Sequence, residues 1–227
     1  FILCNPHNPA GMCWKKETLQ KLADFCYEHH LLVISDEIHC DMAIFGHKHI
    51  PFATVSEKAR ENSITFQAPT KTFNSAGIIS SYAIIPNSHI RKKFYGWVNA
   101  NELDEANIFA PIATIAAFTK GEEWRKAMLA YIEDNVRFIE DYCEKNIPQI
   151  HPLRPQASFL VWLNCRELNL DHKDLLDLFI DKAHLALNDG EMFGQGGEGF
   201  MRMNIATPRS VIKQALDQLA TAVNNLK

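Results

Sequence analysis

The stretch QAPTKTFNSAG, residues 67–77, decides how the rest of this sequence is interpreted. It follows the apolar run SITF (63–66), which predicts a buried strand. Pro69 and Thr70 end that pattern, and a single lysine, Lys71, stands just past the strand. Most lysines are solvated at the surface. A lysine at the end of a core strand has a second explanation, which is that its amine serves chemistry.

Three further apolar runs resemble SITF and predict strands of the same sheet. They are FILC (1–4), LLVIS (31–35) and SYAII (81–85). Between the first two, apolar residues at helical spacing predict an amphipathic helix, through Leu19, Leu22, Ala23 and Cys26. Continuous apolar strands that alternate with helices indicate an α/β fold. We expect a mostly parallel sheet with helices on both faces.

Beyond Pro86 the pattern changes and predicts a second, smaller domain. Residues 88–146 are expected to be largely helical. Strands are predicted at ASFLVWLN (157–164) and FMRMNIA (200–206), and helices at 171–183 and at the C-terminus, where Thr207 and Pro208 suit an N-cap and first turn. The domains expected are 1–125, part of a large domain, and 126–227, a small α+β domain.

Composition narrows the classes of partner. The formal charge is −4 without a basic stripe, which argues against nucleic acid. No apolar run approaches the roughly 20 residues of a membrane helix. The six cysteines form no CxxC motif, so reduced thiols and a cytoplasmic location are expected. His29–His30 and HKH (47–49) lack an evident third ligand, so no metal site is predicted.

The chain opens on FILC, which has the character of a core strand and no initiating Met. We therefore expect the sequence to be the C-terminal part of a longer chain. Part of the sheet and part of any site would then lie in the missing N-terminal portion.

Polar side chains follow three of the predicted strands. Asn8 comes after strand 1–4, Asp36 ends strand 31–35, and Lys71 follows strand 63–66. Ligands of open α/β sheets bind at the carboxyl ends of the strands. An amide, a carboxylate and an amine at three such ends predict one polar site. The alternative is that each residue caps its own turn.

Four ordered motifs then carry a family resemblance over the whole chain: NPHNPAG (5–11), VISDEIH (33–39), APTKTFNSAG (68–77) and GFMRMNIA (199–206). Together they resemble the fold-type I pyridoxal-phosphate (PLP) enzymes, the aspartate aminotransferase superfamily of class I/II. The resemblance implies that Lys71 binds PLP covalently and moves substrate protons, and that Asp36 pairs with the pyridine nitrogen. The non-catalytic alternatives are a salt bridge that stabilises the fold for Asp36 and a solvated surface position for Lys71.

The resemblance implies further roles. Asn8 would bond the phenolic oxygen of the cofactor and contact the substrate, and Arg202 would clamp the substrate α-carboxylate. Thr70 would contact the phosphate. His39 stands where many of these aminotransferases have a tyrosine, and would lie near the ring oxygen. Arg202 could instead be merely exposed, and His39 could simply pack at a strand end.

The string SDEIHCDM with GHKHIPF is similar to the carbon–sulfur β-lyase branch, the cystathionine β-lyases of the MalY and PatB type. That branch implies cleavage of cystathionine or cysteine S-conjugates to thiol, pyruvate and ammonia. An aminotransferase of class I/II is the alternative on the same machinery. A third possibility is a catalytically incompetent fragment that lacks the rest of the cofactor site. Full-length relatives of this kind are expected to be homodimers.

Two positions depart from the family pattern, and one further motif is a false match to a dinucleotide-binding fingerprint. The superfamily often has a phosphate-binding arginine eight residues after the lysine and a serine three before it, where this chain has Ile79 and Ala68. GQGGEG (194–199) matches GxGxxG spacing, but a dinucleotide fingerprint needs a strand before it and a helix after it. We interpret it as a loop that leads to the strand of Arg202.

Overall fold

The structure, a computed structural model, describes residues 1–226 and divides the chain into two compact units. Unit 1 comprises Phe1–His7 and Met12–Met128, and unit 2 comprises Asn8–Gly11 and the chain from Leu129 onward. The division after Met128 falls within the long helix α6 (Glu122–Asn146). The sequence placed its boundary between residues 125 and 126.

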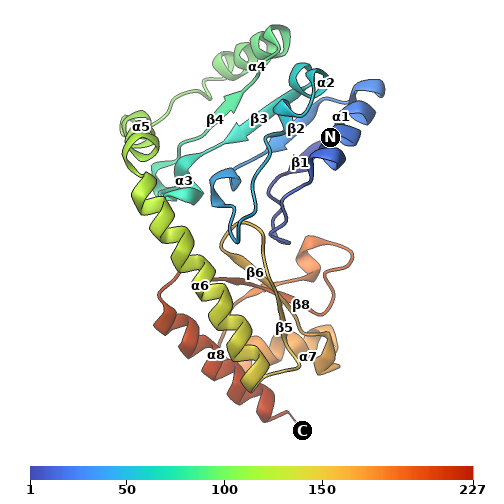
Figure 1. The fold of residues 1–227 in the computed structure, drawn as a ribbon, viewed down its shortest axis with the longest axis vertical. Coiled ribbons are helices and arrows are strands. Elements are labelled where there is room, and N and C mark those ends of the chain that lie inside the picture. Colours follow the sequence, from blue (N-terminus) through green and yellow to red (C-terminus); the bar gives the residue numbers. More distant parts are fainter. Residues whose placement is uncertain (227) are drawn as a thin grey trace. The chain divides into compact units, whose positions relative to one another are not determined.

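The sheet of unit 1 has four strands in the order β1-β2-β3-β4 (Figure 1). Their bounds are Ile2–Cys4, Val33–Asp36, Ser63–Gln67 and Tyr82–Ile84. β1 pairs with β2 and β2 with β3 in parallel, whereas β4 is antiparallel to β3. The expected mostly parallel sheet is confirmed.

Three helices lie between the strands of unit 1, namely α1 (Lys16–Glu28), α2 (Glu57–Glu61) and α3 (Pro69–Thr72). Two more, α4 (Ser88–Ala100) and α5 (Ala110–Lys120), follow β4. The amphipathic helix predicted from the apolar spacing is confirmed, because Leu19, Ala23 and Cys26 of α1 are buried. The helix α3 is a single turn that begins at Pro69, whose fixed φ suits the first helical position.

The register assigns side chains to the two faces of this sheet. Val33 pairs with Ser63 and Ser35 with Thr65, so these residues share one face. On that face Leu3 and Val33 form a core with residues of α1, α2 and Phe52. On the other face the ring of Phe66 meets Phe94 of α4 with centroids 5.7 Å apart. Helices therefore cover both faces.

Two sequence expectations for this unit were wrong in detail. β2 begins at Val33, and the preceding Leu31 and Leu32 are 39% and 36% exposed. The run SYAII (81–85) was expected to form a buried strand like SITF, but β4 is an antiparallel strand whose residue Ile84 is 46% exposed. Leu31 and Leu32 lie between the turn at residues 29–30, which follows α1, and the first residue of β2.

Unit 2 is an antiparallel sheet with helices. Its strands are β5 (His151–Leu153), β6 (Leu160–Asn164), β7 (Asn188–Asp189) and β8 (Phe200–Asn204), in the order β5-β6-β8-β7. Asn135 of α6 donates to the carbonyl of Ile205, and Arg209 of α8 (Arg209–Asn224) donates through Nε to the Asn135 Oδ1 atom, 2.7 Å away. These bonds tie α6 and α8 to the end of β8 (Figure 1).

The helices of unit 2 differ slightly from expectation. The predicted helix 171–183 is α7 (His172–Asp177) followed by a π-helical turn at Leu178–Lys182. The last helix begins at Arg209 with Pro208 as its N-cap, one residue later than predicted, so Thr207 is not the cap. Pro208 has an extended ψ of 142°, which places it outside the helix.

Candidate active site

Two charged side chains follow neighbouring parallel strands of unit 1. Asp36 is the last residue of β2, and Lys71 lies in α3, which begins two residues after β3 ends at Gln67. Because β2 and β3 run parallel, both residues lie at the carboxyl edge of the sheet, where ligands of α/β folds bind. The structure therefore brings the predicted carboxylate and amine to one edge.

Neither Asp36 nor Lys71 has an ionic partner among residues 1–226. Asp36 is exposed, and within residues 1–226 its Oδ1 accepts one hydrogen bond, from the backbone N–H of Ile38 at 3.1 Å. Lys71 is exposed as well, and within residues 1–226 neither residue forms an ion pair. The alternative of a structural salt bridge for Asp36 is therefore wrong for the described chain. Both groups remain available to a ligand.

Thr70 and His39 have different surroundings. Thr70 is half-buried beside Lys71, and its carbonyl accepts the N–H of Ser75 at 2.9 Å. His39 is only 3% exposed, and its carbonyl accepts the N–H of Met42. Their roles toward phosphate and ring oxygen stay predictions.

The positions noted as departures carry no cationic group. Ile79 is 80% exposed and has a left-handed backbone with φ 52°, which a β-branched residue rarely adopts. Ala68 is buried and precedes α3 as its N-cap.

Sequence reasoning missed the most heavily bonded side chain of this region, Glu37. Its Oε1 accepts from the Ser35 hydroxyl at 2.8 Å and from the backbone N–H of Phe52 at 2.9 Å. Its Oε2 lies 2.8 Å from His49 Nε2 and 3.5 Å from Gln67 Nε2. Glu37 is fully buried, so this carboxylate joins β2, β3 and the segment before Phe52.

The strand alternation separates Glu37 from its neighbour. Ser35 and Glu37 are buried on the face of the sheet that α1 and α2 cover, whereas Asp36 points to the opposite face and is exposed. The network continues through Gln67, whose Oε1 accepts from the Tyr82 hydroxyl at 2.9 Å. The only sequence signal for the Glu37 network was the acidic pair Asp36–Glu37 at the strand end, with His49 further along the chain.

A second cluster lies in unit 2 around Arg202. This residue is in the inner strand β8, paired with Trp162 of β6 on one side and Asn188 of β7 on the other. Its Nη1 donates to Asn8 Oδ1 at 2.8 Å, and its Nη2 donates to Asn188 Oδ1 at 2.6 Å. The structure thus joins Asn8 and Arg202, which sequence reasoning had named separately.

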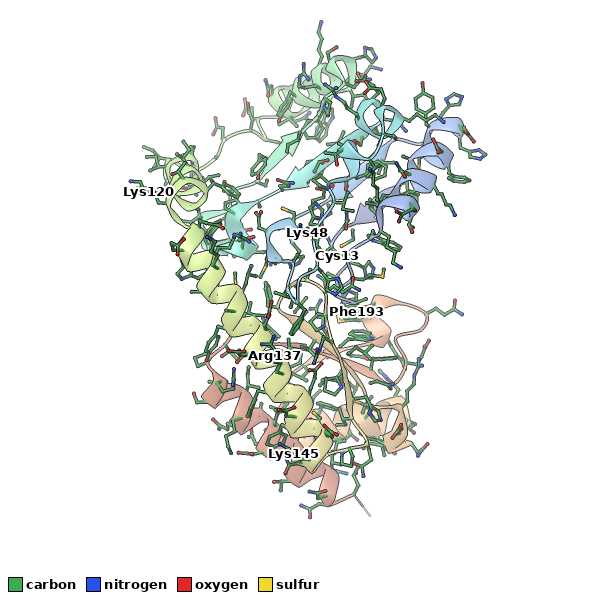
Figure 2. All side chains as sticks on the ribbon, viewed as in Figure 1. Cys13, Lys48, Lys120, Arg137, Lys145 and Phe193 are labelled. Atoms are coloured by element: carbon green, nitrogen blue, oxygen red, sulfur yellow. The ribbon has the colours of Figure 1, made fainter. Side chains whose placement is uncertain are left out.

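The guanidinium of Arg202 is also enclosed by an aromatic ring. Its Cζ lies 4.6 Å from the ring centroid of Phe193, which Figure 2 labels. Burial lowers the pKa of Arg202 from its ordinary value, although a guanidinium remains cationic in proteins. The alternative of a merely exposed arginine is wrong, since the residue is half-buried and donates two hydrogen bonds. Its Nε is buried without a hydrogen-bond partner.

The glycine-rich segment is a loop, as predicted. Gly194, Gly196 and Gly199 all have positive φ, and the segment leads into strand β8 and not into a helix. Arg166 fixes it by donating to the carbonyls of Glu198 and Gly196. The context of a dinucleotide fingerprint is therefore missing.

Residues 1–226 contain no metal cluster, membrane-spanning helix or disulfide. This part of the chain contains no group of three His, Cys, Asp or Glu side chains placed to hold a metal ion. No described helix is long and apolar enough to span a membrane. The six cysteines are all free thiols.

Comparison with known proteins places these features in a family. The chain is 40% identical over 224 residues to the cystathionine β-lyase PatB of Bacillus subtilis, covering 99% of this chain and 58% of that protein. It is 33% identical over 228 residues to the protein MalY of Escherichia coli, with 100% and 58% covered.

A solved structure gives the same result for the fold. The chain superimposes on cystalysin of Treponema denticola, whose structure contains a pyridoxal 5′-phosphate cofactor, with a TM-score of 0.96 and 36% identity, covering 100% of this chain and 57% of that one. The chain thus spans less than two thirds of the length of these relatives. The model of the family described as aminotransferase class I and II matches residues 1–219, and the chain belongs to that family.

Proposed function

We propose that the protein is a PLP-dependent carbon–sulfur β-lyase that acts on cystathionine or a cysteine S-conjugate. The observation that carries the proposal is that Asp36 and Lys71 lie at one edge of the parallel sheet and that neither forms an ion pair within residues 1–226. The similarity to PatB, named a cystathionine β-lyase, supports the reaction class. The cofactor in cystalysin supports the cofactor.

The residues present fit PLP chemically. A primary amine is the group that binds an aldehyde, and a carboxylate is the group that keeps a pyridine nitrogen protonated. Asp36 has no competing cation in the described chain, and Lys71 has no competing anion. When bound, PLP supplies an electron sink for the charge that develops at the substrate Cα.

Each side chain of the proposed site would then have a separate role. Lys71, as the neutral amine, would hold the cofactor and carry the proton removed from the substrate Cα. Asp36 would hold the pyridine nitrogen. Asn8 Oδ1 accepts from Arg202, so its Nδ2 is the atom that would donate to the phenolic oxygen. Thr70 would contact the phosphate and His39 the region of the ring oxygen.

Arg202 would fix the substrate by its α-carboxylate. A guanidinium presents paired N–H groups that match the two oxygens of a carboxylate. Loss of the thiol from Cβ, followed by hydrolysis, would give pyruvate and ammonia. The leaving group is a thiol in the proposed substrates, so no acceptor keto acid is required.

The experiment uses the full-length protein with L-cystathionine. Pyruvate formed without an added keto acid supports the lyase, whereas amino transfer that depends on a keto acid supports the alternative. Borohydride reduction followed by peptide mapping should place a phosphopyridoxyl group on Lys71. Lys71→Ala should abolish the adduct and the activity, and Lys120→Ala, an exposed lysine labelled in Figure 2, should change neither.

An aminotransferase of class I/II remains the second candidate. The similarity to the aspartate aminotransferase of Pyrococcus abyssi, at 26% identity over 227 residues, favours it. This identity is lower than the 40% to PatB, which is why the lyase is proposed first. The third candidate, a catalytically incompetent fragment, is tested with the 227-residue chain by itself. If that chain shows neither reaction nor PLP binding while the full-length protein shows both, residues outside this chain are needed to hold the cofactor.

We also propose a cytoplasmic homodimer. Six free thiols suit a reducing compartment. Apolar side chains on and near α5 support association, because Ile108, Phe109 and Ile112 are 78%, 68% and 68% exposed. Size-exclusion chromatography with light scattering would test the dimer, and a monomer at micromolar concentration would contradict it.

A further inference from the structure

Arg202 is held by residues that sequence reasoning did not name. It is on β8, and the neighbouring strand β7 has only two residues, Asn188 and Asp189. Asn188 pairs directly with Arg202 across the strands, so the two side chains stand on the same face. The Asn188 Oδ1 atom accepts the Nη2–H at 2.6 Å.

An aromatic wall adds a second restraint. Phe193 lies 4.6 Å from Arg202 Cζ. The same ring meets Trp162 at 5.6 Å with an interplanar angle of 74°, and Trp162 stacks on Phe200 at 5.2 Å and 16°. Phe193 is therefore fixed from behind by a packed pair of aromatic rings. Cation–π attraction then favours one position of the guanidinium.

We propose that Asn188 and Phe193 are positioning residues that hold the guanidinium of Arg202 ready for the carboxylate of an amino-acid ligand. The inference rests on the proposed function, since it presupposes that Arg202 binds that carboxylate. A guanidinium has five N–H donors, of which Asn8 and Asn188 each accept one. The remaining donors include the buried Nε–H, which has no hydrogen-bond partner.

The restraint lowers the cost of binding. A free arginine side chain must lose rotamer freedom when a ligand immobilises it. Here two hydrogen bonds and a ring contact have already fixed it, so a carboxylate gains the paired hydrogen bonds without that loss. Asn188 does this without competing charge, because an amide oxygen binds a guanidinium more weakly than a carboxylate does.

The test compares two ligands that differ only by the carboxylate. L-Alanine and ethylamine are titrated separately into the full-length holoenzyme, and the change in cofactor absorbance gives each dissociation constant. Asn188→Ala should weaken L-alanine binding about tenfold and leave ethylamine within about twofold. Phe193→Leu should act in the same direction with a smaller effect.

A charged replacement sharpens the comparison. Asn188→Asp would place a carboxylate on Arg202 and should weaken L-alanine binding by about a hundredfold, since its negative charge already compensates the guanidinium and repels the carboxylate of the ligand. Gln214→Glu makes the same amide-to-carboxylate exchange on the exposed face of α8 and should change neither constant. With a sulfur-containing substrate, KM should rise more than kcat falls.

The outcomes separate the two proposals. A wild-type holoenzyme that binds PLP and forms pyruvate, combined with variants that weaken both ligands equally or neither, overturns the positioning role and leaves the proposed function intact. A wild-type protein that binds neither PLP nor L-alanine overturns the proposed function and the positioning role with it.

Discussion

Replacing the buried carboxylate of Glu37 should destabilise unit 1 strongly. Glu37→Leu removes the acceptor of the Ser35 hydroxyl, the Phe52 N–H, His49 Nε2 and Gln67 Nε2. Each buried donor left without its acceptor costs about 1–3 kcal/mol. Because the leucine restores some apolar burial, we expect a loss of about 3–5 kcal/mol.

The isosteric variant should lose less. In Glu37→Gln the amide oxygen still accepts from Ser35 and Phe52. On the other side, its new NH₂ group faces His49 Nε2, which accepts it only in the Nδ1–H tautomer. The change exchanges hydrogen bonds to a charged group for neutral ones, so we expect a loss of about 1–2 kcal/mol.

Hydrogen exchange with mass spectrometry is the appropriate assay, because it reports each unit separately. The free energy of opening of the β2 amides should fall by the amounts above, while peptides from β6 of unit 2 serve as an internal reference. Glu57→Gln, whose side chain is 74% exposed, should stay within about 0.5 kcal/mol. A loss below about 1 kcal/mol in Glu37→Leu would refute the reasoning.

Two further predictions concern titratable groups of unit 2. Hydrogen bonds from Lys213 and then Tyr142 hold the pKa of Asp217 below its ordinary value of 3.8. A depressed carboxyl pKa stabilises the fold above the unfolded-state pKa, and this contribution is lost as the pH falls through the folded-state pKa. Asp217→Asn should therefore be less stable than the wild type at neutral pH, and thermal melts should show the difference shrinking below pH 3.8; a constant difference would contradict this. Burial raises the pKa of Cys165 to about 12, so iodoacetamide should label it only when unit 2 unfolds. Peptide mapping with and without urea tests this, and labelling in the native protein as fast as at the half-exposed Cys13 would oppose it.

The sequence predicted those parts of the molecule that depend on local pattern. Apolar runs located β1, β2, β3 and the central strands of unit 2, since a buried strand must be apolar over several residues. Asp36 was found because it directly follows such a run, and Lys71 because it stands five residues after the end of another. The GxGxxG match at 194–199 could be rejected as a dinucleotide-binding motif because the segment after it was correctly predicted to be a strand and not a helix.

The remainder depends on contacts between distant residues. Glu37 and His49 meet only through the path of the segment between them, and nothing in their spacing specifies that path. Asn188 lies in a strand of two residues, which is too short to show any periodicity. Its importance follows from its register with Arg202, fourteen residues later in the chain. The true start of β2 was missed because Leu31 and Leu32 extend the apolar run beyond the paired residues.

The alternation at the end of β2 places two adjacent residues under different structural constraints. Asp36 is exposed on one face, whereas Glu37 is buried in its network on the other. Substitutions at position 36 should cost little folding free energy, because within residues 1–226 this side chain accepts one local hydrogen bond and forms no ion pair. Libraries that test the proposed role of Asp36 can therefore randomise residue 36 while residue 37 is kept constant. A deletion of one residue here would exchange the two faces and lose both properties at once.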